Sequence, residues 1–416
     1  MKNMYECSLE RMGEKITAFR KLGLNEDGSL TRYALSDEEA LLREEFIFRM
    51  SAIGAFIETD DMANMYATLP GRDPKAKRIV MGSHIDSVKN GGHYDGILGV
   101  ISGMEVLETV YHEKIEHSHP LTVMIWTNEE GSLFPPAIMS SGVITGKFSK
   151  EAMLESKSII NEEFTFGDAL QKSKYRGSVE NRLNGEKYEL MLELHVEQGP
   201  VLEEEVKDIG VVTCVLGMVN YRIRTYGQAN HAGTTPMKHR KDALYAATKI
   251  IQYLHDELDK LDDRLVYTTG EIKCHPCIHT VIPDYVDFSL DARHEDEAVL
   301  KRVAEIIESI PDEIAACRTE KVKAWSRSTV YFDKRLVKYV KDSADELKYS
   351  NMYINSGAGH DAQYAADMLP TTMIFVPSEK GYSHCKEEFT TLEQCTKGAS
   401  VMLNTVIHID RDAAVN

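Results

Sequence analysis

Four short, mostly apolar runs constrain the fold of this chain most strongly, and they lie at residues 78–81, 121–126, 189–194 and 373–376. Such runs are expected of strands that are buried on both faces of a sheet. Between the first two runs, segment 95–111 carries apolar residues at roughly helical spacing. This β-loop-α-β order predicts an α/β fold with a mixed, mostly parallel sheet flanked by helices.

The remaining segments predict a second domain inside the first. A chain of 416 residues is too long for one ordinary core. Strand-like segments 218–226 and 281–292 alternate with helical patterns around 242–258 and 297–307. We therefore expect a smaller α+β domain inserted into the main one. The expected main domain is formed by 1–212 and 330–416, and the inserted domain spans 213–329.

The segment before about residue 75 is expected to be largely helical. Ser36 and Glu39 form a capping-box pattern at the start of one helix, which continues through apolar residues such as Leu42 and Phe46.

The composition excludes several classes of partner. The net charge of −18, with no run of four basic residues, argues against nucleic acid and against an anionic membrane. No apolar stretch approaches the length of a membrane span, and the N-terminus lacks the apolar core of a signal peptide. Seven scattered cysteines fit a reducing compartment, so we expect a cytoplasmic protein.

Reactive side chains gather in short motifs at or near the ends of the expected strands. In sheets of this kind, ligands collect beyond the carboxyl ends of the strands. The motifs are GSHID (82–86), NGGHYDG (90–96), TNEEG (127–131), ELHVEQGP (193–200) and YSH (382–384).

Each motif alone also has a structural explanation. His84, with Asp86 nearby, suits a loop start as well as a metal ligand whose ring is oriented by a carboxylate. Asp95 is placed to cap the next helix, although the glycines around it indicate an unusual backbone. A solvated loop would tolerate the adjacent Glu129 and Glu130, but a sharper explanation is that one binds metal and the other acts on water.

Taken together, the motifs predict a metal site. They supply three histidines and two carboxylates without a thiolate, so Zn²⁺, Mn²⁺, Co²⁺ and Ni²⁺ are all chemically possible. Two such ions with two carboxylate ligands leave a positive site, which lowers the pKa of a bound water. The expected ligands are His84, Asp95, His195, His384 and one of the adjacent glutamates Glu129 and Glu130.

At these residues the sequence resembles the N-carbamoyl-L-amino-acid hydrolase family, which includes allantoate amidohydrolases and β-ureidopropionases. The wider group consists of dinuclear metallopeptidases and deacylases, with a catalytic α/β domain interrupted by a lid and dimerisation domain. The resemblance covers nearly the whole chain, in the family's order. It rests on GSHIDSVKNGGHYDG, TNEEGSLFPPAIMSSGV, ELHVEQGPVLE, GQANHAGTTPM, SGAGHDA and SHCKEEFT.

The resemblance implies two divalent ions per chain, zinc or manganese, with cobalt and nickel as alternatives. Asp95 would bridge the two ions. His84 and His195 would complete one metal site, and Glu130 and His384 the other.

The resemblance also implies the roles of the remaining site residues. Glu129 would be the general base, and Asp86 would orient His84. From the inserted domain, His231 would polarise the scissile carbonyl and Arg293 would bind a substrate carboxylate. Further substrate contacts are implied for Gln198, Gly357 and Ala358.

One segment departs from the family pattern. Thr280 stands where the family has the second Asn of Pro-Asn-x-x-Asn, and Cys277 replaces the first Asn. Thr280 is kept as a substrate-binding residue, but its hydroxyl reaches less far than an amide, so a different substrate is an open alternative. Neighbouring His279 could contribute instead. Cys274 and Cys277 have the spacing of a redox or zinc pair, but no second pair follows, which disfavours a third metal site.

The resemblance implies hydrolysis of a linear amide or ureido bond, first of all conversion of an N-carbamoyl-L-amino acid into the amino acid, ammonia and carbon dioxide. The alternatives are an allantoate amidohydrolase and an N-acyl amino acid deacylase. A non-catalytic binding protein on the same scaffold is a remote alternative, since the base and all expected ligands are present. The expected partners are a small carboxylate-bearing substrate and a second copy of the chain, bound through the lid domain.

Overall fold

A computed structural model describes residues 4–413, which form two compact units. Unit 1 contains the chain up to Thr213 and from Phe332 onward, and unit 2 is Cys214–Tyr331. Unit 2 thus begins one residue later and ends two residues later than the inserted domain expected at 213–329.

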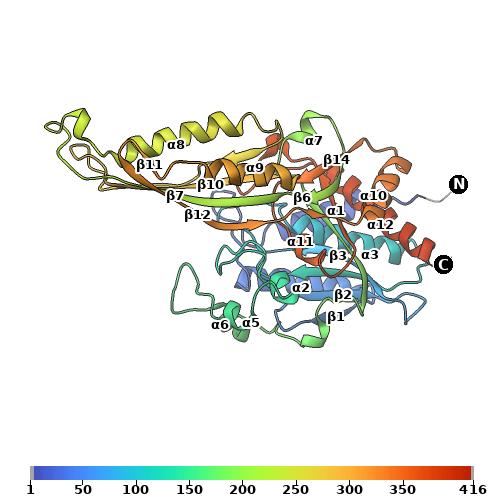
Figure 1. The fold of residues 1–416 in the computed structure, drawn as a ribbon. Coiled ribbons are helices and arrows are strands. Elements are labelled where there is room, and N and C mark those ends of the chain that lie inside the picture. The colour runs from blue at the N-terminus through green and yellow to red at the C-terminus, as the bar shows by residue number, and fades with distance from the viewer. Residues whose placement is uncertain (1–3, 414–416) are drawn as a thin grey trace. The chain divides into compact units, whose positions relative to one another are not determined.

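The larger sheet, most of which belongs to unit 1, has a mixed strand order (Figure 1). Its central strands β4, β3, β5 and β15 are mutually parallel, and the outer pairs are antiparallel. The four apolar runs lie in these parallel strands, so that prediction is confirmed. In spatial order the strands are β1 (Phe56–Thr59), β2 (Met65–Leu69), β4 (Leu121–Trp126), β3 (Arg78–His84), β5 (Tyr188–Val196), β15 (Thr371–Val376), β6 (Ile209–Val215) and β13 (Val330–Tyr331), and β14 (Asn351–Ser356) pairs with β6.

Helix α3 (Ile97–His112) is the helix expected at 95–111, and it packs on β3, β4 and β5. Its glycines allow the close approach. A Cβ at Gly99 would lie 2.4 Å from the carbonyl oxygen of Leu194, and one at Gly103 would lie 2.5 Å from Val123. The other helices of unit 1 are α1 (Leu9–Phe19), α2 (Asp37–Ala52), α4 (Met139–Ile144), α5 (Lys150–Leu154), α6 (Phe166–Lys172), α7 (Val201–Glu204), α10 (Lys334–Glu346), α11 (Asp361–Ala365) and α12 (Leu392–Ala413), with 3₁₀ turns η1 (Val179–Asn181) and η3 (Glu379–Gly381).

The N-terminal segment differs from its expectation in two respects. It contains the antiparallel strands β1 and β2 besides its helices, so the largely helical prediction is wrong there. Such short strands give too few residues for a periodicity to show. At α2, the Ser36 hydroxyl accepts from the backbone N–H of Glu39, but the Glu39 carboxylate accepts from the backbone N–H of Leu35. The reciprocal half of the capping box is therefore displaced by one residue.

Unit 2 is an antiparallel sheet covered by two helices. Inward residues of β7 and β10, such as Ile223 and Phe288, alternate with polar ones and pack on Ile250 of α8 and Val303 of α9. The elements are β11 (Glu313–Ile314), β12 (Cys317–Arg327), β7 (Gly217–Tyr226), β10 (Tyr285–His294), β8 (Val266–Thr268), β9 (Ile272–His275), η2 (Met237–His239), α8 (Ala243–Leu258) and α9 (Glu297–Glu308).

A buried ion-pair cluster ties α1 to α3. The Lys15 side chain is fully buried, and its Nζ lies 2.8 Å from Glu105 Oε2 and also contacts Glu108. Arg11 adds a second cation, 2.6 Å from Glu105 Oε1. Because two carboxylates and a lysine are withdrawn from water here, each depends on its partners.

Replacing Lys15 by Met should therefore destabilise unit 1 by roughly 3–5 kcal/mol, since it leaves buried carboxylates with too little counter-charge. Urea denaturation followed by fluorescence measures the change. The control is Lys338→Ala, which removes an exposed i,i+4 pair with Asp342 on α10 and should shift the urea midpoint little. Equal midpoints for the two variants would contradict a stabilising role for the cluster.

Candidate metal centre

The carboxyl ends of three parallel strands bring the expected ligands together. His84 is the last residue of β3, Glu129 and Glu130 follow β4, and His195 is near the end of β5. Asp95 comes two residues before the first residue of α3, and His384 lies in the loop after β15. Because these strands run parallel, their side chains converge at one edge of the sheet.

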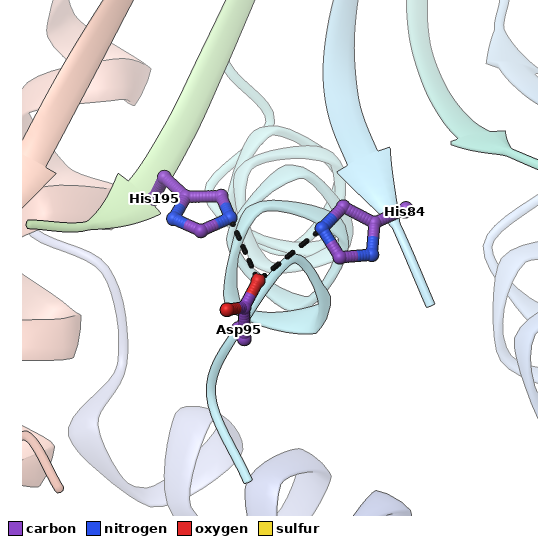
Figure 2. A group of neighbouring side chains, drawn as sticks. All are labelled: His84, Asp95 and His195. Atoms are coloured by element: carbon purple, nitrogen blue, oxygen red, sulfur yellow. Dashed lines mark ion pairs between the residues drawn. The ribbon is translucent and has the colours of Figure 1, made fainter. Parts of the chain in front are cut away.

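Asp95 lies at the centre of this group (Figure 2). Its Oδ1 is 3.3 Å from His84 Nε2 and 3.2 Å from His195 Nε2. Its Oδ2 is 3.2 Å from His384 Nε2, and that ring nitrogen is 3.6 Å from Glu130 Oε2. Each oxygen of Asp95 thus faces a different set of side chains, an arrangement that suits a carboxylate bridging two cations.

Two of the histidines have their ring orientation fixed by backbone carbonyls. His84 Nδ1 lies 2.9 Å from the carbonyl oxygen of Asp86, and His195 Nδ1 lies 2.9 Å from that of Val196. A ring nitrogen in contact with a carbonyl carries the proton, so the lone pair of each neutral ring is on Nε2, toward Asp95. This is how metal-binding histidines are usually prepared.

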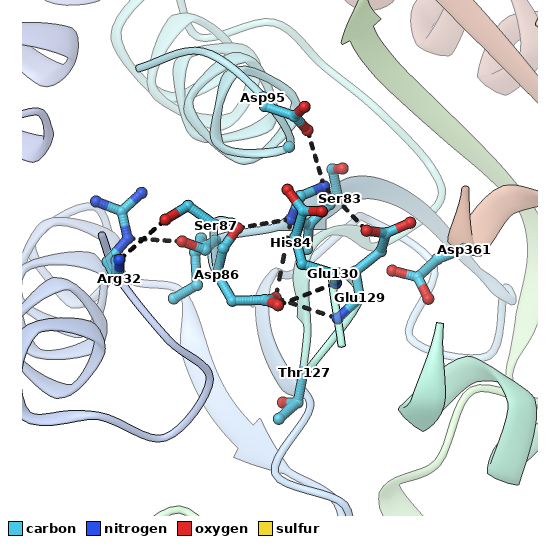
Figure 3. A network of polar contacts seen from close by, with 12 residues as sticks. Arg32, Ser83, His84, Asp86, Ser87, Asp95, Thr127, Glu129, Glu130 and Asp361 are labelled. Carbon is cyan, nitrogen blue, oxygen red and sulfur yellow. Dashed lines mark hydrogen bonds and ion pairs between the residues drawn. The ribbon is translucent and has the colours of Figure 1, made fainter. Parts of the chain in front are cut away.

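Asp86 acts differently from the expectation. Its carboxylate is 3.8 Å from His84 Nδ1, so its carbonyl and not its side chain holds the ring. The carboxylate instead accepts the backbone N–H groups of Glu129, at 3.2 Å, and Glu130, at 3.0 Å (Figure 3). Asp86 therefore fixes the acidic loop after β4 against the end of β3.

The carboxylates of this site are buried close to one another. Burial and the nearby Asp95 raise the pKa of Glu130 to about 8. Burial, together with Glu130, raises the pKa of Glu129 well above its ordinary value despite the opposing effect of His84. Burial alone would also raise the pKa of Asp95, but the surrounding histidines hold it well below the usual range. Closely spaced carboxylates that contact the same histidine rings are suited to binding divalent cations.

The donor atoms also meet the geometric requirement for a metal. Ligand atoms of His84, Asp95 and His195 all lie within 4.8 Å of one another, as do those of Asp95, Glu130 and His384. Within residues 4–413, the buried Glu130 Oε1 has no hydrogen-bond partner. A cation would supply that partner, so these side chains fit a metal pair.

Gly96 is required by the close packing of this site. Its φ is +66°, and a Cβ there would lie 2.3 Å from the ring of His84. Gly96 also occupies the N-cap position of α3, without a side-chain cap. The alternative role of Asp95 as a helix cap is therefore not realised, and its carboxylate is directed to the histidines.

Glu388 is a buried site residue that sequence reasoning missed. Its Oε1 accepts the backbone N–H groups of Tyr94, at 2.8 Å, and Asp95, at 3.0 Å. Burial and Asp95 raise the pKa of Glu388 to about 7. In the sequence it is one of two adjacent glutamates after His384, and nothing there separates it from its exposed neighbour Glu387.

Glu193 and Asp361 are a second pair of buried carboxyl groups that sequence reasoning missed. Glu193 accepts from the Ser83 hydroxyl at 2.6 Å and from the backbone N–H of Ala362 at 3.0 Å. Asp361, labelled in Figure 3, accepts from the Ser141 hydroxyl. Burial, with Glu193, raises the pKa of Asp361 well above its ordinary value.

Of the expected substrate residues of unit 1, Gln198 contacts Asp95, and Gly357 and Ala358 lie in the turn after β14. Gln198 donates from Nε2 to Asp95 Oδ2 at 2.8 Å, and its buried Oε1 has no partner among the described residues. Gly357 and Ala358 follow β14, and the Ala358 carbonyl accepts from the Ser356 hydroxyl at 2.9 Å.

The other expected substrate residues belong to unit 2. His231 forms a β-bridge with Val281, and the Thr280 carbonyl accepts the backbone N–H of Ala232 at 2.9 Å. Arg293, on β10, donates from Nε to Asp291 at 2.8 Å.

A scan against protein families matches residues 80–408 to Peptidase family M20/M25/M40. The chain belongs to this family. Family M20/M25/M40 relatives include the N-carbamoyl-L-amino-acid amidohydrolase of Rhizobium meliloti, 35% identical over 96% of this chain and 95% of the relative. The allantoate amidohydrolase of Bacillus subtilis (strain 168) is 34% identical over 91% of this chain and 92% of the relative.

Among solved structures, an amidase of the hydantoinase/carbamoylase family from Burkholderia multivorans matches with a TM-score of 0.89 and 36% identity. The match covers 97% of this chain and 98% of that one, so the α/β architecture of this family member is shared over nearly its full length. None of the helices within 4–413 is both long and apolar enough to span a membrane.

Because Glu388 holds the backbone at Asp95, Glu388→Ala should weaken Zn²⁺ or Mn²⁺ binding by roughly 10–100-fold, as is usual when a group that orients a ligand is lost. Competition with a fluorescent chelator measures the affinity. The matched control is Glu387→Ala at the exposed neighbour, which should bind like the wild type. Wild-type affinity in Glu388→Ala would show that Asp95 is placed without this carboxylate.

Proposed function

We propose that the chain is a metal-dependent amidohydrolase that cleaves a linear ureido bond, converting an N-carbamoyl-L-amino acid into the amino acid, ammonia and carbon dioxide. The observation that carries this proposal is Asp95 between two groups of ligand atoms, with Glu129 beside them. The names of the relatives support a hydrolase acting on C–N bonds other than peptide bonds.

In this proposal His84, Asp95 and His195 hold one divalent ion, and Asp95, Glu130 and His384 hold the second. Zinc and manganese are the first candidates, because imidazole and carboxylate ligands suit both. When bound, such ions lower the pKa of a water molecule and polarise the scissile carbonyl.

Glu129 is the proposed general base. Its Oε2 lies 3.7 Å from His84 Nε2, and Asp86 holds its backbone. It accepts a proton from the attacking water and returns it to the leaving nitrogen.

Unit 2 is proposed to recognise the substrate. Arg293 would bind the substrate carboxylate through its guanidinium, exchanging its present contact with Asp291. His231 would donate a hydrogen bond to the oxyanion that forms at the attacked carbon. Thr280 would contact the substrate through its hydroxyl.

The same unit is the proposed dimer interface. Helix α8 exposes Leu244, Tyr245 and Tyr253, with exposed fractions of 36%, 53% and 38%. Aromatic side chains of this kind are enriched at protein interfaces. We also propose a cytoplasmic location, which the free state of all seven cysteines supports.

The second candidate function is hydrolysis of allantoate. It is favoured by the Bacillus subtilis relative, whose identity to this chain is nearly that of the first relative. A deacylase for N-acyl amino acids is the third candidate.

A substrate panel tests these alternatives. The protein is stripped of metal with a chelator, reloaded with Zn²⁺ or Mn²⁺, and given N-carbamoyl amino acids, allantoate and N-acyl amino acids. We expect ammonia release from N-carbamoyl amino acids with the highest kcat/KM, and little activity before reloading. Preference for allantoate, or release of a carboxylate from N-acyl substrates alone, would replace the proposed substrate by that alternative.

The neighbouring glutamates should separate by role. Glu129→Gln should keep the metal content of the wild type while kcat falls by at least about 10²–10⁴-fold, because a general base is lost. Glu130→Gln should lose metal, which elemental analysis of both variants measures. Substantial activity in Glu129→Gln would assign the proton transfer to another group.

A further inference from the structure

Unit 2 carries a pair of cysteines that the proposed reaction does not use. Cys274 is in strand β9, half-buried, and packs against the core of unit 2. Cys277 is exposed and follows a bend at Pro276. The remaining cysteines are not arranged in a Cys-x-x-Cys motif.

The two cysteines are neighbours in the chain, on either side of the bend at Pro276. Cys277 follows Cys274 by three residues and interacts with its thiol electrostatically. His275 lies between them in the sequence, and its Nδ1 is 2.8 Å from Asp284. Burial raises the pKa of the Cys274 thiol, and Cys277, Asp242 and Asp284 raise it further, so Cys274 is the less reactive thiol of the pair.

A metal at this pair has no support from the structure. None of the groups of three potential ligands found within residues 4–413 includes Cys274 or Cys277. Two thiols without further ligands form an incomplete site for zinc, which takes four ligands in structural sites. A disulfide needs no side chain beyond the two cysteines, so disulfide formation is the reaction that this pair can undergo.

The pair adjoins the turn that carries Thr280. The backbone N–H of Val281 donates to the carbonyl of Ile278 at 3.0 Å, closing this turn. Ala232 donates to the Thr280 carbonyl at 2.9 Å, and Ile282 donates to the Asn230 carbonyl at 2.8 Å. The turn after Cys277 is thus hydrogen-bonded to the segment on either side of His231.

Closing a disulfide would move Cys277 more than Cys274. Cys274 is held by the pairing of β9 with β10, where it lies opposite Val286. Cys277 is in an exposed loop with a φ of +56°. A disulfide requires Cβ atoms about 3.8 Å apart, so the adjustment falls on the loop and on the turn that follows it.

We propose that Cys274 and Cys277 form a reversible disulfide by exchange with a low-molecular-weight disulfide, and that its closure disturbs the 278–282 turn beside His231. The effect on catalysis rests on the proposed function, in which His231 and Thr280 contact the substrate. The dithiol itself does not depend on that function.

The exchange proceeds in two balanced steps. The exposed Cys277, as thiolate, attacks one sulfur of the small disulfide, forming a mixed disulfide and releasing one small thiol. Cys274 then loses its proton and attacks the Cys277 sulfur, forming the internal disulfide and releasing the second small thiol. The protein loses two electrons and two protons, and the small disulfide becomes two thiols.

Mass spectrometry with oxidised glutathione tests the site and the order of attack. The wild-type peptide that contains both cysteines should become two hydrogen atoms lighter. Cys274→Ser should retain glutathione on Cys277, and Cys277→Ser should be modified at least about tenfold more slowly, because its remaining thiol is less accessible. Two free thiols in the wild type, or stable glutathione on wild-type Cys277, would overturn the proposal.

Two further measurements test the coupling to the turn. Oxidation should speed hydrogen exchange at the amides of Ala232 and Ile282. It should also lower kcat/KM about tenfold or more with metal content unchanged, and reduction should restore both. The double variant Cys274→Ser/Cys277→Ser, which keeps Cys385, should respond to neither treatment. An oxidised wild type with unchanged exchange and kcat/KM would overturn the coupling. If the reduced protein hydrolysed none of the panel substrates, only the proposed function would fail, because mass and exchange still report on the dithiol.

Discussion

The burial of several carboxyl groups around Asp95 is the constraint on which the rest of unit 1 depends. Desolvation disfavours the charged form of each group, and adjacent carboxylates disfavour it further. Three histidines, from β3, β5 and the loop after β15, place a ring nitrogen next to the Asp95 carboxylate. These contacts offset part of the cost of burying it. Such an arrangement is costly as a structural element alone, and the divalent cations of the proposed function would offset that cost.

Most of the contacts that hold the side chains around Asp95 in place are made with backbone groups. Carbonyl oxygens orient His84 and His195, while Asp86 and Glu388 bind backbone N–H groups of the segments that carry the ligands. Backbone positions are set by the sheet and by α3, so the ligand geometry is coupled to the fold itself. The absence of a side chain at Gly96 then lets α3 begin against the ring of His84.

The sequence predicts the parts of this arrangement that have a local signal. The four central strands are apolar enough to be recognised, and the ligand motifs follow them at the places where parallel strands present side chains. Strands β1 and β2 are too short to show a period. Glu388 and Asp86 act on backbone atoms distant in the chain, and the pairing of a carboxylate with an N–H some 290 residues away has no local signature.

The choice of side chain is restricted more strongly by the buried charges of unit 1 than by the backbone hydrogen bonds of the 277–282 segment in unit 2. In unit 1 a change at Asp95 or at one of the histidines beside it removes the counterpart of several buried charges, so these positions leave little room for substitution. The 277–282 segment of unit 2 is largely exposed and held mainly by backbone hydrogen bonds, which are indifferent to side-chain identity. The side chains of Thr280 and Cys277 can therefore vary without loss of the backbone hydrogen bonds of this turn.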